Sequence, residues 1–524
     1  RQSKMAFSLA GVAAFGSLGA HHEFHETYSL VHSSHRFEFF RVGGEEIGEG
    51  FGIVLQDLTP ATAGRLGLPR DTEGAVVINV QQGSTAEESD VRPGDVILSV
   101  NRSDVSSATE AATQLNQIES GRTAFLLVQR QETRGFLQVR KEQMSLTEVI
   151  RQQIRQQGPL PFATYADLAL YHPEFGYYTR VGQRSGRRGD FVTSVDFGSS
   201  LGTLLAAQCT EMWRHLNSCR FGLVEAGAGN GRLSRDILDA VSSSESSFYQ
   251  AIDLHLVERS PTARKAQTKE LSSHRSKLVS SGATLPADDS ITGVILANEL
   301  LDAFAPHILV MTGTELREVY IDADTNGSFV ERLGPLSSSH IQAHIEEQKI
   351  VIKPGWRIEV VPEVVTWVKK AVRVLRRGFL LLIDYGHEAR ELYSATHSQG
   401  TVATYFQHQV ETTNTTAAQP WLIEPGSRDI TTHVNLTAVR TAAESAGATT
   451  LGILDQTYFL LGLGAAEHAT TTTSTEDLGS LRRRLAMKSL LIPGGLGSTQ
   501  KVMVFGKDIG TPTLSGLSFQ IRAT

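Results

Sequence analysis

Cysteine is almost absent from this chain. Its 524 residues contain only Cys209 and Cys219, too few for a disulfide framework or for a zinc site built from cysteines, and we therefore expect a reducing compartment. Dense basic stretches are also missing: 49 Lys and Arg stand against 56 Asp and Glu, for a formal net charge of -7. This composition gives no electrostatic footprint for nucleic acid or an anionic membrane, so we expect neither as a partner.

The chain also lacks a convincing long apolar run. The stretch "MAFSLAGVAAFGSLGA" follows Arg1 and Lys4 like the core of a signal peptide, but it is rich in Gly, Ala and Ser and poor in Leu. We expect neither a true signal nor stable membrane insertion. The following "HHEFHETYSLVHSSH" holds five histidines; a disordered or tag-like segment is favoured over metal binding there. Because the chain begins at Arg1 rather than Met, residues 1–47 are expected to be a poorly defined segment of a fragment or processed product.

The length allows two folded units. Between residues 48 and 142, short β-like runs ("FGIVLQDL", "GAVVINVQ", "DVILSVN", "TAFLLVQR") are separated by turn residues and by one helical stretch, "ATEAATQLNQI". This pattern predicts a small, mostly β domain. No Gly-x-Ser-Gly-Gly stretch occurs, so we expect no serine protease activity.

The segment "GSTAEESDVRPGDVILSVNRSDV" resembles a PDZ domain of the HtrA type, with Arg92-Pro93-Gly94-Asp95 as its most specific part. The resemblance implies that an extended peptide adds as a strand to a sheet edge and that its C-terminal carboxylate is bound by backbone N–H groups of a loop. The matching loop is Gly50, Phe51, Gly52 and Ile53. A PDZ fold that merely spaces the next domain is an equally good interpretation.

A second unit is expected over residues 144–510. After Met144, "SLTEVIRQQIRQQ" has a capping Ser, a Glu three residues on and an amphipathic pattern, which together predict the start of a helix. Further on, apolar runs alternate with helical stretches, which predicts an open α/β sheet of parallel strands with helices on both faces. Ligands of such sheets bind at the carboxyl ends of the strands.

The most informative stretch is "LVEAGAGNGR", with Glu225, Gly227, Gly229 and Gly231. A dinucleotide-binding turn requires its third glycine where this chain has Arg232, so the spacing excludes that turn. A tight turn of glycines that follows a carboxylate at the end of a strand has no side chains in the way, so a flat or sulfonium-bearing nucleoside can lie against its backbone. Glu258 ends the next strand and is placed to accept both ribose hydroxyls. Taken singly, Glu258 could be a surface acid and Asn298 a helix cap.

From Pro161 to Gly464 the chain resembles the MidA-like class I S-adenosylmethionine-dependent methyltransferases, whose mitochondrial members are complex I assembly-factor protein arginine methyltransferases. The motifs include "YHPEFGYYT", "GDFVTS", "VEAGAGNGRLSRDIL", "ANELLDAFAPH", "LLIDYGHE" and "EPGSRDITTHV". The resemblance implies a Rossmann-like sheet and S-adenosyl-L-methionine as cofactor. It places the cofactor at Asp190, Thr193, Glu225, Gly227, Gly229, Gly231, Glu258 and Asn298. The chain departs from the family at Val195-Asp196, Ala228 and Leu300-Leu301.

On the substrate side the resemblance implies Glu299 and Asp302, which are three residues apart and share a face if the chain is helical there. A guanidinium is a poor nucleophile while it is delocalised, so a site for arginine requires carboxylates that bind it through two N–H groups. His433, near Asp429, is a candidate proton acceptor, although a structural role is the more frequent one for a lone His. We expect no metal site, because the histidines of this unit are scattered in sequence.

The favoured function is methyl transfer to a protein arginine, with a complex I subunit as a candidate substrate and with a C-terminal peptide as a second partner at the PDZ groove. Two alternatives remain: a peptide-binding scaffold with an inactive methyltransferase fold, and a methyltransferase acting on a small molecule. We expect a cytoplasmic location, or the mitochondrial matrix in a eukaryote.

Overall fold

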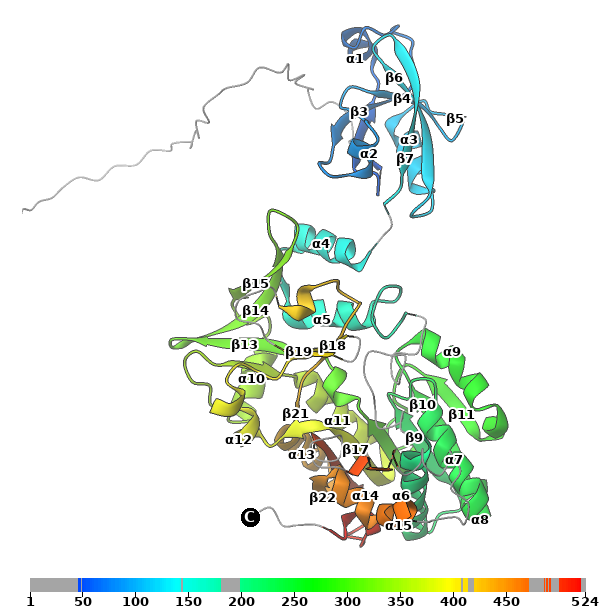
Figure 1. Cartoon of the computed structure of the whole chain (residues 1–524), viewed down its shortest axis with the longest axis vertical. Helices are drawn as coiled ribbons and strands as arrows, with labels where there is room; N and C mark the ends of the chain where they lie inside the picture. The colour runs from blue at the N-terminus through cyan, green and yellow to red at the C-terminus, as the bar shows by residue number, and fades with distance from the viewer. Residues whose placement is uncertain are drawn as a thin grey trace, which may run out of the picture. The chain divides into compact units, whose positions relative to one another are not determined.

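The structure is a computed structural model that describes residues 46–48, 50–142, 145–180, 198–406, 409–412, 419–470, 485, 487, 488, 490, 491 and 499–519. The chain divides into two compact units, Arg1–Gln143 and Met144–Thr524, which are treated separately below (Figure 1). Among the described residues, no helix combines the length and the apolar character needed to cross a lipid bilayer.

The N-terminal unit is an antiparallel sheet with three short helices. Its strands lie in the order β1, β2, β3, β4, β6, β7, with β5 beside β4. Their bounds are Glu46–Gly48, Ile53–Asp57, Ala75–Val80, Val96–Val100, Thr123–Arg130 and Thr133–Arg140, with β5 at Ser103–Asp104. The helices are α1 (Pro60–Arg65), α2 (Thr85–Glu88) and α3 (Ala108–Asn116). The predicted small, mostly β domain with a helix is confirmed.

The Arg-Pro-Gly-Asp stretch of this unit closes a turn through Asp95, which is buried. One carboxylate oxygen of Asp95 accepts a hydrogen bond from the backbone N–H of Arg92 at 2.9 Å. Arg130 on β6 donates to both oxygens, at 2.6 and 2.8 Å. A buried carboxylate needs such a fork of donors to compensate its lost hydration. Through Asp95 the motif therefore holds the turn that precedes β4 against strand β6.

The C-terminal unit is built around an eight-stranded sheet in the order β11, β10, β9, β12, β17, β23, β22, with β21 paired to the end of β17. All pairs from β11 to β17 are parallel, whereas β23 runs antiparallel to both of its neighbours. The bounds in that spatial order are Leu278–Gly282, Ile252–Val257, Phe221–Ala226, Ile291–Asn298, Leu375–His387, Gln500–Lys507 and Thr449–Asp455, with β21 at Val434–Asn435.

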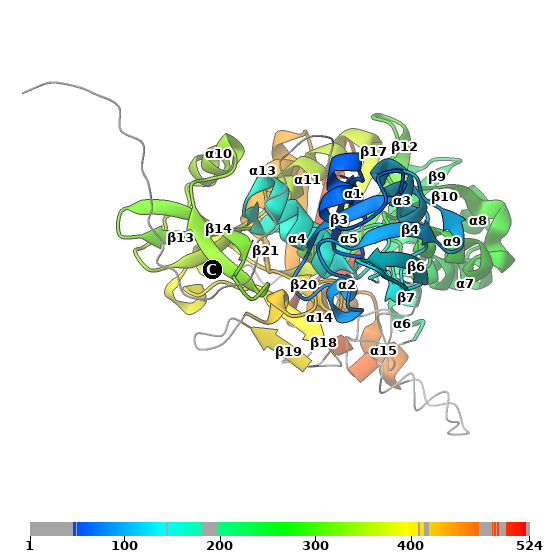
Figure 2. The ribbon, with the colours of Figure 1, turned by 90° about the horizontal axis from the view of Figure 1, so that it is seen from above.

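Helices cover both faces of this sheet. On β9, Leu223 packs into a core with α6 (Ser200–Leu216) and α7 (Arg232–Ser244). Its neighbour Val224 points to the opposite face and packs with α11 (Pro362–Val374) and α13 (Leu436–Ser445). The helices α11 and α13 can be followed in Figure 2. Successive side chains of a strand point to opposite faces, and a parallel strand covered on both faces is apolar throughout. The predicted α/β sheet with helices on both faces is confirmed.

Between β12 and β17 the chain forms a second, antiparallel sheet in the order β15, β14, β13, β16, with β8 beside β14. These strands span Phe329–Gly334, Glu315–Ala323, His307–Thr312, Arg357–Val360 and Leu160–Pro161. Two helices, α4 (Leu146–Gln157) and α5 (Phe162–Tyr171), share a hydrophobic core with it. Ser145 caps α4 by accepting from the N–H of Glu148 at 3.3 Å, which confirms the helix start predicted after Met144.

The remaining elements of this unit are short. Strands β18 (Ala403–Phe406), β19 (Gln409–Thr412) and β20 (Asp429–Thr431) form a three-stranded sheet. The other helices are α8 (Ser246–Ala251), α9 (Pro261–Glu270), α10 (Ser339–Glu347), α12 (Ala389–Leu392), α14 (Gln456–Gly462) and α15 (Ala465–Thr470), and the 3-10 helices are η2 (Ser272–Lys277), η3 (Leu301–Ala303), η4 (Ala395–His397), η5 (Pro420–Leu422) and η6 (Ser515–Leu517).

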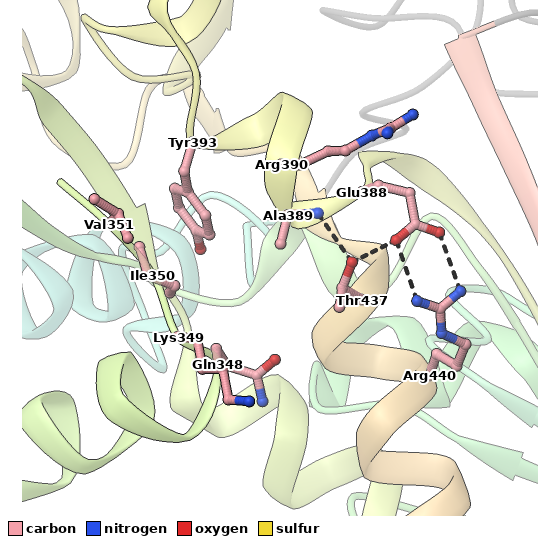
Figure 3. Close-up of a pocket in the computed structure, with 10 residues that line it drawn as sticks. All are labelled: Gln348, Lys349, Ile350, Val351, Glu388, Ala389, Arg390, Tyr393, Thr437 and Arg440. Atoms are coloured by element: carbon pink, nitrogen blue, oxygen red, sulfur yellow. Dashed lines mark hydrogen bonds and ion pairs between the residues drawn. The ribbon is translucent and has the colours of Figure 1, made fainter. Parts of the chain in front are cut away.

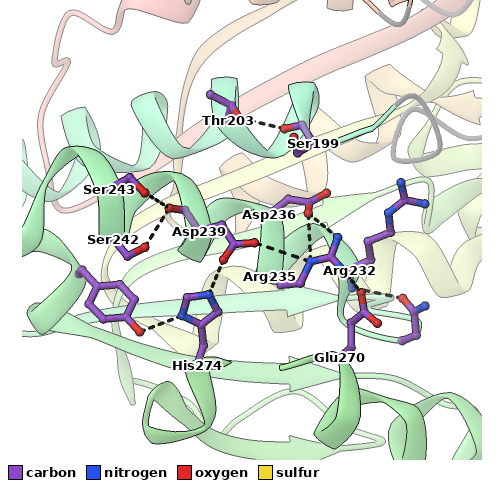
Figure 4. A network of polar contacts seen from close by, with 12 residues as sticks. Ser199, Thr203, Arg232, Arg235, Asp236, Asp239, Ser242, Ser243, Glu270 and His274 are labelled. Atoms are coloured by element: carbon purple, nitrogen blue, oxygen red, sulfur yellow. Dashed lines mark hydrogen bonds and ion pairs between the residues drawn. The ribbon is translucent and has the colours of Figure 1, made fainter. Parts of the chain in front are cut away.

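Helix α7 is held to its neighbours by a network of charged side chains (Figure 4). Arg235 pairs with the buried Asp236 beside it and with Glu270 at the end of α9. Asp239, one turn further along α7, accepts from His274 at 2.8 Å. These contacts fix the orientation of α7 relative to α9 and η2. They therefore also position the turn that precedes α7.

Candidate functional site

The turn between β9 and α7 contains three glycines with left-handed backbone: φ is +71° at Gly227, +50° at Gly229 and +87° at Gly231. A Cβ disfavours this conformation, which accounts for the glycines. The N–H groups of Gly227 and Ala228 both donate to the carbonyl of Val257, at 2.9 and 3.1 Å. A Cβ on Gly229 would meet nothing within 4 Å. Hydrogen bonds thus hold the turn at the end of β10, and the space where a Gly229 side chain would lie is free of described atoms.

Glu258 lies directly beside this turn. Its Oε2 accepts a hydrogen bond from the N–H of Gly229 at 2.8 Å, and its Oε1 accepts from the N–H of Ser260 at 2.7 Å. Each carboxylate oxygen can accept a second bond. The half-buried side chain is therefore fixed at the edge of the turn with acceptor capacity left for a polyol such as a ribose.

Glu225 lies buried near the end of β9, just before the glycine turn. Its Oε2 accepts from the backbone N–H of Ser234 at 3.1 Å and also from the Ser234 hydroxyl. Burial raises the pKa of this carboxyl to about 7, although the Ser234 hydrogen bonds favour the charged form. Through these hydrogen bonds Glu225 anchors the first turn of α7. Its carboxylate is buried, whereas the backbone at Gly229 is open.

Four carboxylates gather at the carboxyl ends of β12 and β17: Glu299, Asp302, Asp384 and Asp429, called the acid cluster below. Burial raises the pKa of Asp302 well above its usual range, and the charges of the other three members raise it further. Burial also raises the pKa of Asp384 to about 7. Like charges in a low-dielectric region oppose ionisation, so the cluster favours a bound cation.

The backbone around β12 explains how these acids are brought together. Asp384 Oδ2 accepts from the N–H groups of Leu300 and Leu301 at 3.1 and 2.7 Å. Glu299 has φ +51°, a left-handed conformation that costs on the order of 1 kcal/mol or more for a residue with a Cβ. Its Oε1 accepts from Gln500 on β23 at 2.6 Å. Strain of this kind, held by surrounding contacts, is frequent at functional sites.

The condition under which Glu299 and Asp302 would share a helical face is therefore not met. Only the 3-10 turn η3, Leu301–Ala303, forms, and Glu299 lies before it. Leu300 is the residue before that turn, so Asn298 is not its cap. Within the described part of the chain the Oδ1 of Asn298 is buried without a hydrogen-bond partner. It is a polar atom at the site that a ligand can satisfy.

Tyrosines surround the acid cluster. Tyr178 donates from its hydroxyl to Asp429 Oδ1 at 2.9 Å and stacks on Tyr171 at 5.4 Å between ring centroids. Burial raises the pKa of Tyr385 and of Tyr405, and the neighbouring Glu299 and Asp302 contribute to both shifts. Sequence reasoning missed these rings as site residues, although "YHPEFGYYT" and "DYG" contain three of the four.

His433 lies in the segment beside the acid cluster, since the N–H of the preceding Thr432 donates to the carbonyl of Asp302. Burial lowers its pKa to about 4, and the nearby His387 and His397 lower it further. The rings of His387 and His397 lie 5.0 and 6.2 Å from that of His433, between centroids. The histidines of this unit are scattered in sequence, but the fold brings three of them together.

Asp190 and Thr193, expected in a loop over the cofactor, lie outside the described residues. A cavity of about 630 Å³ does occur elsewhere in the unit (Figure 3). It lies between the end of α10 and the helices α12 and α13, and Figure 3 shows Glu388 pairing with Thr437 and Arg440 at its wall. None of its lining residues belongs to the glycine turn or to the acid cluster.

In the N-terminal unit, the expected carboxylate-binding loop forms a tight turn. Gly50 and Gly52 have φ +73° and +74°, and Phe51 is fully buried. Ile53 begins β2, the strand that a bound peptide would pair with. That side of β2 is already paired with β1, in the register Glu46–Leu55 to Gly48–Ile53. The N–H of Phe51 donates to the carbonyl of Gly48 at 3.2 Å. The chain's own β1 therefore occupies the predicted groove.

Comparisons with known proteins agree with this geometry. Residues 204–454 match the model of a family described as "Putative S-adenosyl-L-methionine-dependent methyltransferase", and residues 50–140 match the PDZ domain model. The chain is 28% identical over 336 residues to the mitochondrial "Protein arginine methyltransferase NDUFAF7 homolog" of Drosophila melanogaster. That match covers 58% of this chain and 71% of the relative.

A solved structure with the same architecture is a "likely methyl transferase from Burkholderia thailandensis bound to S-adenosyl-homocysteine". It is 26% identical, covers 71% of this chain and 94% of its own, and has a TM-score of 0.64. The N-terminal unit is 36% identical over 92 residues to a "Probable periplasmic serine endoprotease DegP-like" of Chlamydia pneumoniae, which is 18% of this chain and 19% of that protein. The likeness to that protease is confined to the PDZ region.

The glycine turn, the strand order and these matches lead to one assignment. The C-terminal unit has the fold of an S-adenosyl-L-methionine-dependent methyltransferase and matches that family over residues 204–454, it is related to the mitochondrial protein arginine methyltransferases, and a PDZ domain precedes it in the chain.

Proposed function

We propose that the C-terminal unit transfers the methyl group of S-adenosyl-L-methionine to a guanidinium nitrogen of an arginine in a protein substrate. The observation that carries this proposal is the acid cluster, which lies next to the glycine turn. Leu300, between Glu299 and Leu301, packs so close to Gly227 that a Cβ there would lie 3.1 Å from Leu300 Cδ1. A cation in the acid cluster would therefore lie beside a ligand on the turn.

The residues of the turn fit the cofactor. The backbone is open above Gly229, and Glu258 supports the turn with acceptor capacity left for the two ribose hydroxyls. Asn298 Oδ1 offers an acceptor that no described residue satisfies. We assign Gly227, Gly229, Gly231, Glu258 and Asn298 to cofactor binding. When bound, the cofactor supplies a methyl group attached to a positively charged sulfur.

The acid cluster fits a guanidinium. Carboxylates bind its planar N–H groups in pairs, and they hold its positive charge away from the nitrogen that attacks. The S–C bond breaks as the N–C bond forms, and the displaced proton of the nitrogen passes to a carboxylate of the cluster. Glu299 and Asp302 are the members we assign to this contact. The chain's main contribution is orientation, because an in-line displacement needs the two reactants held in contact.

His433 is not assigned a catalytic role in this proposal. Its imidazole belongs to the three-histidine group, and the low pKa that follows from its burial makes it a weak base. A carboxylate of the acid cluster, with a pKa raised toward neutrality, is the better acceptor for the proton.

The test is to incubate the full chain with S-adenosyl-L-methionine carrying a labelled methyl group and with a panel of arginine-containing peptides. Matched peptides with Lys in place of Arg serve as controls. Label recovered as methylarginine, and its loss in Asp302→Asn with cofactor binding intact, would support the proposal. Label on lysine or only on a small molecule would contradict it, as would cofactor binding without transfer to any member of the panel.

The relatives suggest where to look for the substrate. They are named as mitochondrial, and sequence resemblance points to assembly factors of complex I. Subunits of that complex that expose arginine are the first proteins to add to the assay. A cytoplasmic location remains a prediction, and fractionation of cells that express the chain would test it against a mitochondrial one.

For the N-terminal unit we propose capture of a C-terminal peptide, in competition with β1. A peptide would pair with β2 and place its carboxylate at the N–H groups of Gly50–Ile53. In the structure β1 pairs with this edge of β2, and Asn116 of α3 donates to the carbonyl of Ile47, within β1, at 3.3 Å. The pairing of the chain's own segment is the observation that favours a regulated groove over an inert spacer.

A further inference from the structure

Three histidines from three segments converge beside the carboxyl end of the main sheet. His387 is the last residue of β17, His397 ends η4, and His433 lies between β20 and β21. One nitrogen from each ring lies within 4.8 Å of the other two. The centroids of the His387 and His397 rings are 4.8 Å apart. None of the three has been assigned a function above.

Glu391, on α12, orients two of these rings. Its carboxylate Oε1 lies 3.2 Å from Nδ1 of His387, and its backbone carbonyl accepts from Nδ1 of His397 at 2.9 Å. Because Nδ1 donates in both contacts, Nε2 of each neutral ring carries the free lone pair. A carboxylate or carbonyl behind a histidine is the arrangement that fixes the tautomer of metal-ligating imidazoles.

His433 is held by its backbone rather than by its ring. Its N–H donates to Thr401 Oγ1 at 3.1 Å, and the same hydroxyl lies 2.9 Å from Thr432 Oγ1. The Nδ1 of His433 is buried, and no described residue forms a hydrogen bond with it. A buried imidazole nitrogen without a partner is unfavourable unless a ligand supplies one.

The nitrogen donors of the group favour a metal cation as that ligand. Neutral imidazole is the form that binds metal, and imidazole selects transition metals such as zinc over calcium and magnesium, which prefer oxygen. A single zinc ion would accept one nitrogen lone pair from each ring, through bonds of about 2.0–2.1 Å.

We propose that His387, His397 and His433 bind a divalent transition-metal ion of the zinc type, with Glu391 orienting two of the ligands. Three protein ligands leave a fourth position for water or an outside group. This assignment replaces the expectation from sequence that the chain has no metal site. It does not depend on the proposed methyl transfer.

The site also adjoins the acid cluster through the backbone. The N–H of Thr432, next to His433, donates to the carbonyl of Asp302 at 3.2 Å, and His387 follows Asp384 by three residues on β17. A dication bound by the three histidines would therefore act on the cluster through its charge and through the position of the 429–433 segment.

The test is titration of the metal-free full chain with Co²⁺, followed by visible absorption, and with Zn²⁺ in competition. Three imidazoles and one water give cobalt a four-coordinate site with intense bands, whereas loosely bound, hydrated cobalt gives weak ones. The expected result is one equivalent with intense absorption, abolished by Zn²⁺. The N-terminal histidines, at positions 21, 22, 25, 32 and 35, are present in every variant and so cancel in the comparison.

His397→Gln should abolish the intense absorption, and His340→Gln, at an exposed position on α10, should leave it unchanged. Glu391→Gln should weaken zinc affinity about 10- to 100-fold, as expected for a carboxylate that orients a metal-binding imidazole. Circular dichroism and S-adenosyl-homocysteine binding confirm that His397→Gln is folded. Equal cobalt spectra for the parent and a folded His397→Gln variant would overturn the proposal, and so would a parent chain that gives only weak bands.

Discussion

Leu300 packs against Gly227, with its Cδ1 3.1 Å from the point where a Cβ on that glycine would lie. The segment that carries Glu299 and Asp302 is therefore in contact with the turn that the cofactor needs. In-line methyl transfer requires donor and acceptor to touch, and this contact is where the fold brings their two binding regions together.

Gly227→Ala should weaken binding of S-adenosyl-homocysteine by at least about tenfold. The left-handed backbone costs alanine about 1–2 kcal/mol, and the new methyl group displaces Leu300. Calorimetric titration measures the affinity. Gly282→Ala is the matched control, because that glycine, at the end of the same sheet, would meet nothing with a Cβ and is not left-handed. Equal affinity for the parent and Gly227→Ala would contradict the assignment of the turn.

Binding of an arginine peptide should strengthen as pH rises from 6 to 8. Burial raises the pKa of Asp384 to about 7, and Glu299 adds to that rise, so the acid cluster gains negative charge across this range. The affinity is expected to increase by up to about tenfold. Titration calorimetry in the presence of S-adenosyl-homocysteine measures it. The same peptide with neutral citrulline in place of arginine should show no such rise. If the affinity for the arginine peptide does not change with pH, the acid cluster does not take part in binding the substrate.

The stability of the C-terminal unit should also depend on Glu225. Its pKa is raised from 4.5 to about 7 in the folded state. The folded state thus holds this proton more tightly than the unfolded state. The contribution of Glu225 to the unfolding free energy therefore falls as pH rises from about 4.5 to 7, by up to about 3 kcal/mol. In Glu225→Gln this contribution no longer changes with pH.

Urea unfolding at pH 5 and pH 8, followed by tryptophan fluorescence, measures the difference. All four tryptophans lie after residue 200, so the signal reports on the C-terminal unit alone. Between the two pH values the parent should lose stability relative to Glu225→Gln, whereas Glu174→Gln, at an exposed position, should follow the parent. If the parent and Glu225→Gln change in parallel, the carboxyl is not protonated in the folded state near pH 5.

Displacing β1 should open the PDZ groove. A side chain at Gly48 would meet Ile53 at 2.8 Å and Leu115 at 3.2 Å, so Gly48→Val should prevent β1 from pairing with β2. If β1 occupies the edge nine-tenths of the time, affinity for a hydrophobic C-terminal peptide should rise about tenfold. Fluorescence anisotropy with a labelled peptide measures this.

Ile47→Val is the control for this variant, because the Ile47 side chain is 60% exposed and the strand pairing does not depend on it. A peptide with an amidated C-terminus should bind neither protein well, because the loop N–H groups then lack a carboxylate. Unchanged affinity in a folded Gly48→Val variant would mean that β1 does not control access to the groove.

Much of the catalytic unit could be predicted from sequence, because its signals are local. Apolar runs of strand length alternate with helices, and a glycine turn follows one run directly, so β9, the turn and α7 are readable in order. Acids at strand ends fall at one edge of a parallel sheet whatever the loops do, which is why Glu225 and Glu258 could be placed in the same region.

The histidine group could not be predicted in this way. His397 and His433 are 36 residues apart, and they meet only because η4 and the segment before β21 fold back against the end of β17. The hydrogen bonds of Glu225 could not be predicted for a related reason: the sequence shows that an acid ends a strand, but its partners depend on where Ser234 lies in the next helix. The pairing of β1 with β2 also requires tertiary information, since three residues give no periodicity.

The position of β23 has a consequence for how the chain matures. This strand is synthesised after every other strand of the main sheet, yet it lies inside the sheet, between β17 and β22. Gln500 at its start supplies the hydrogen bond to Glu299. A nascent or truncated chain that lacks β23 would leave two open sheet edges and would lack the hydrogen bond from Gln500 to Glu299. Translation must therefore pass β23 before the protein can acquire activity, and products cut short before it are expected to be both inactive and prone to aggregation.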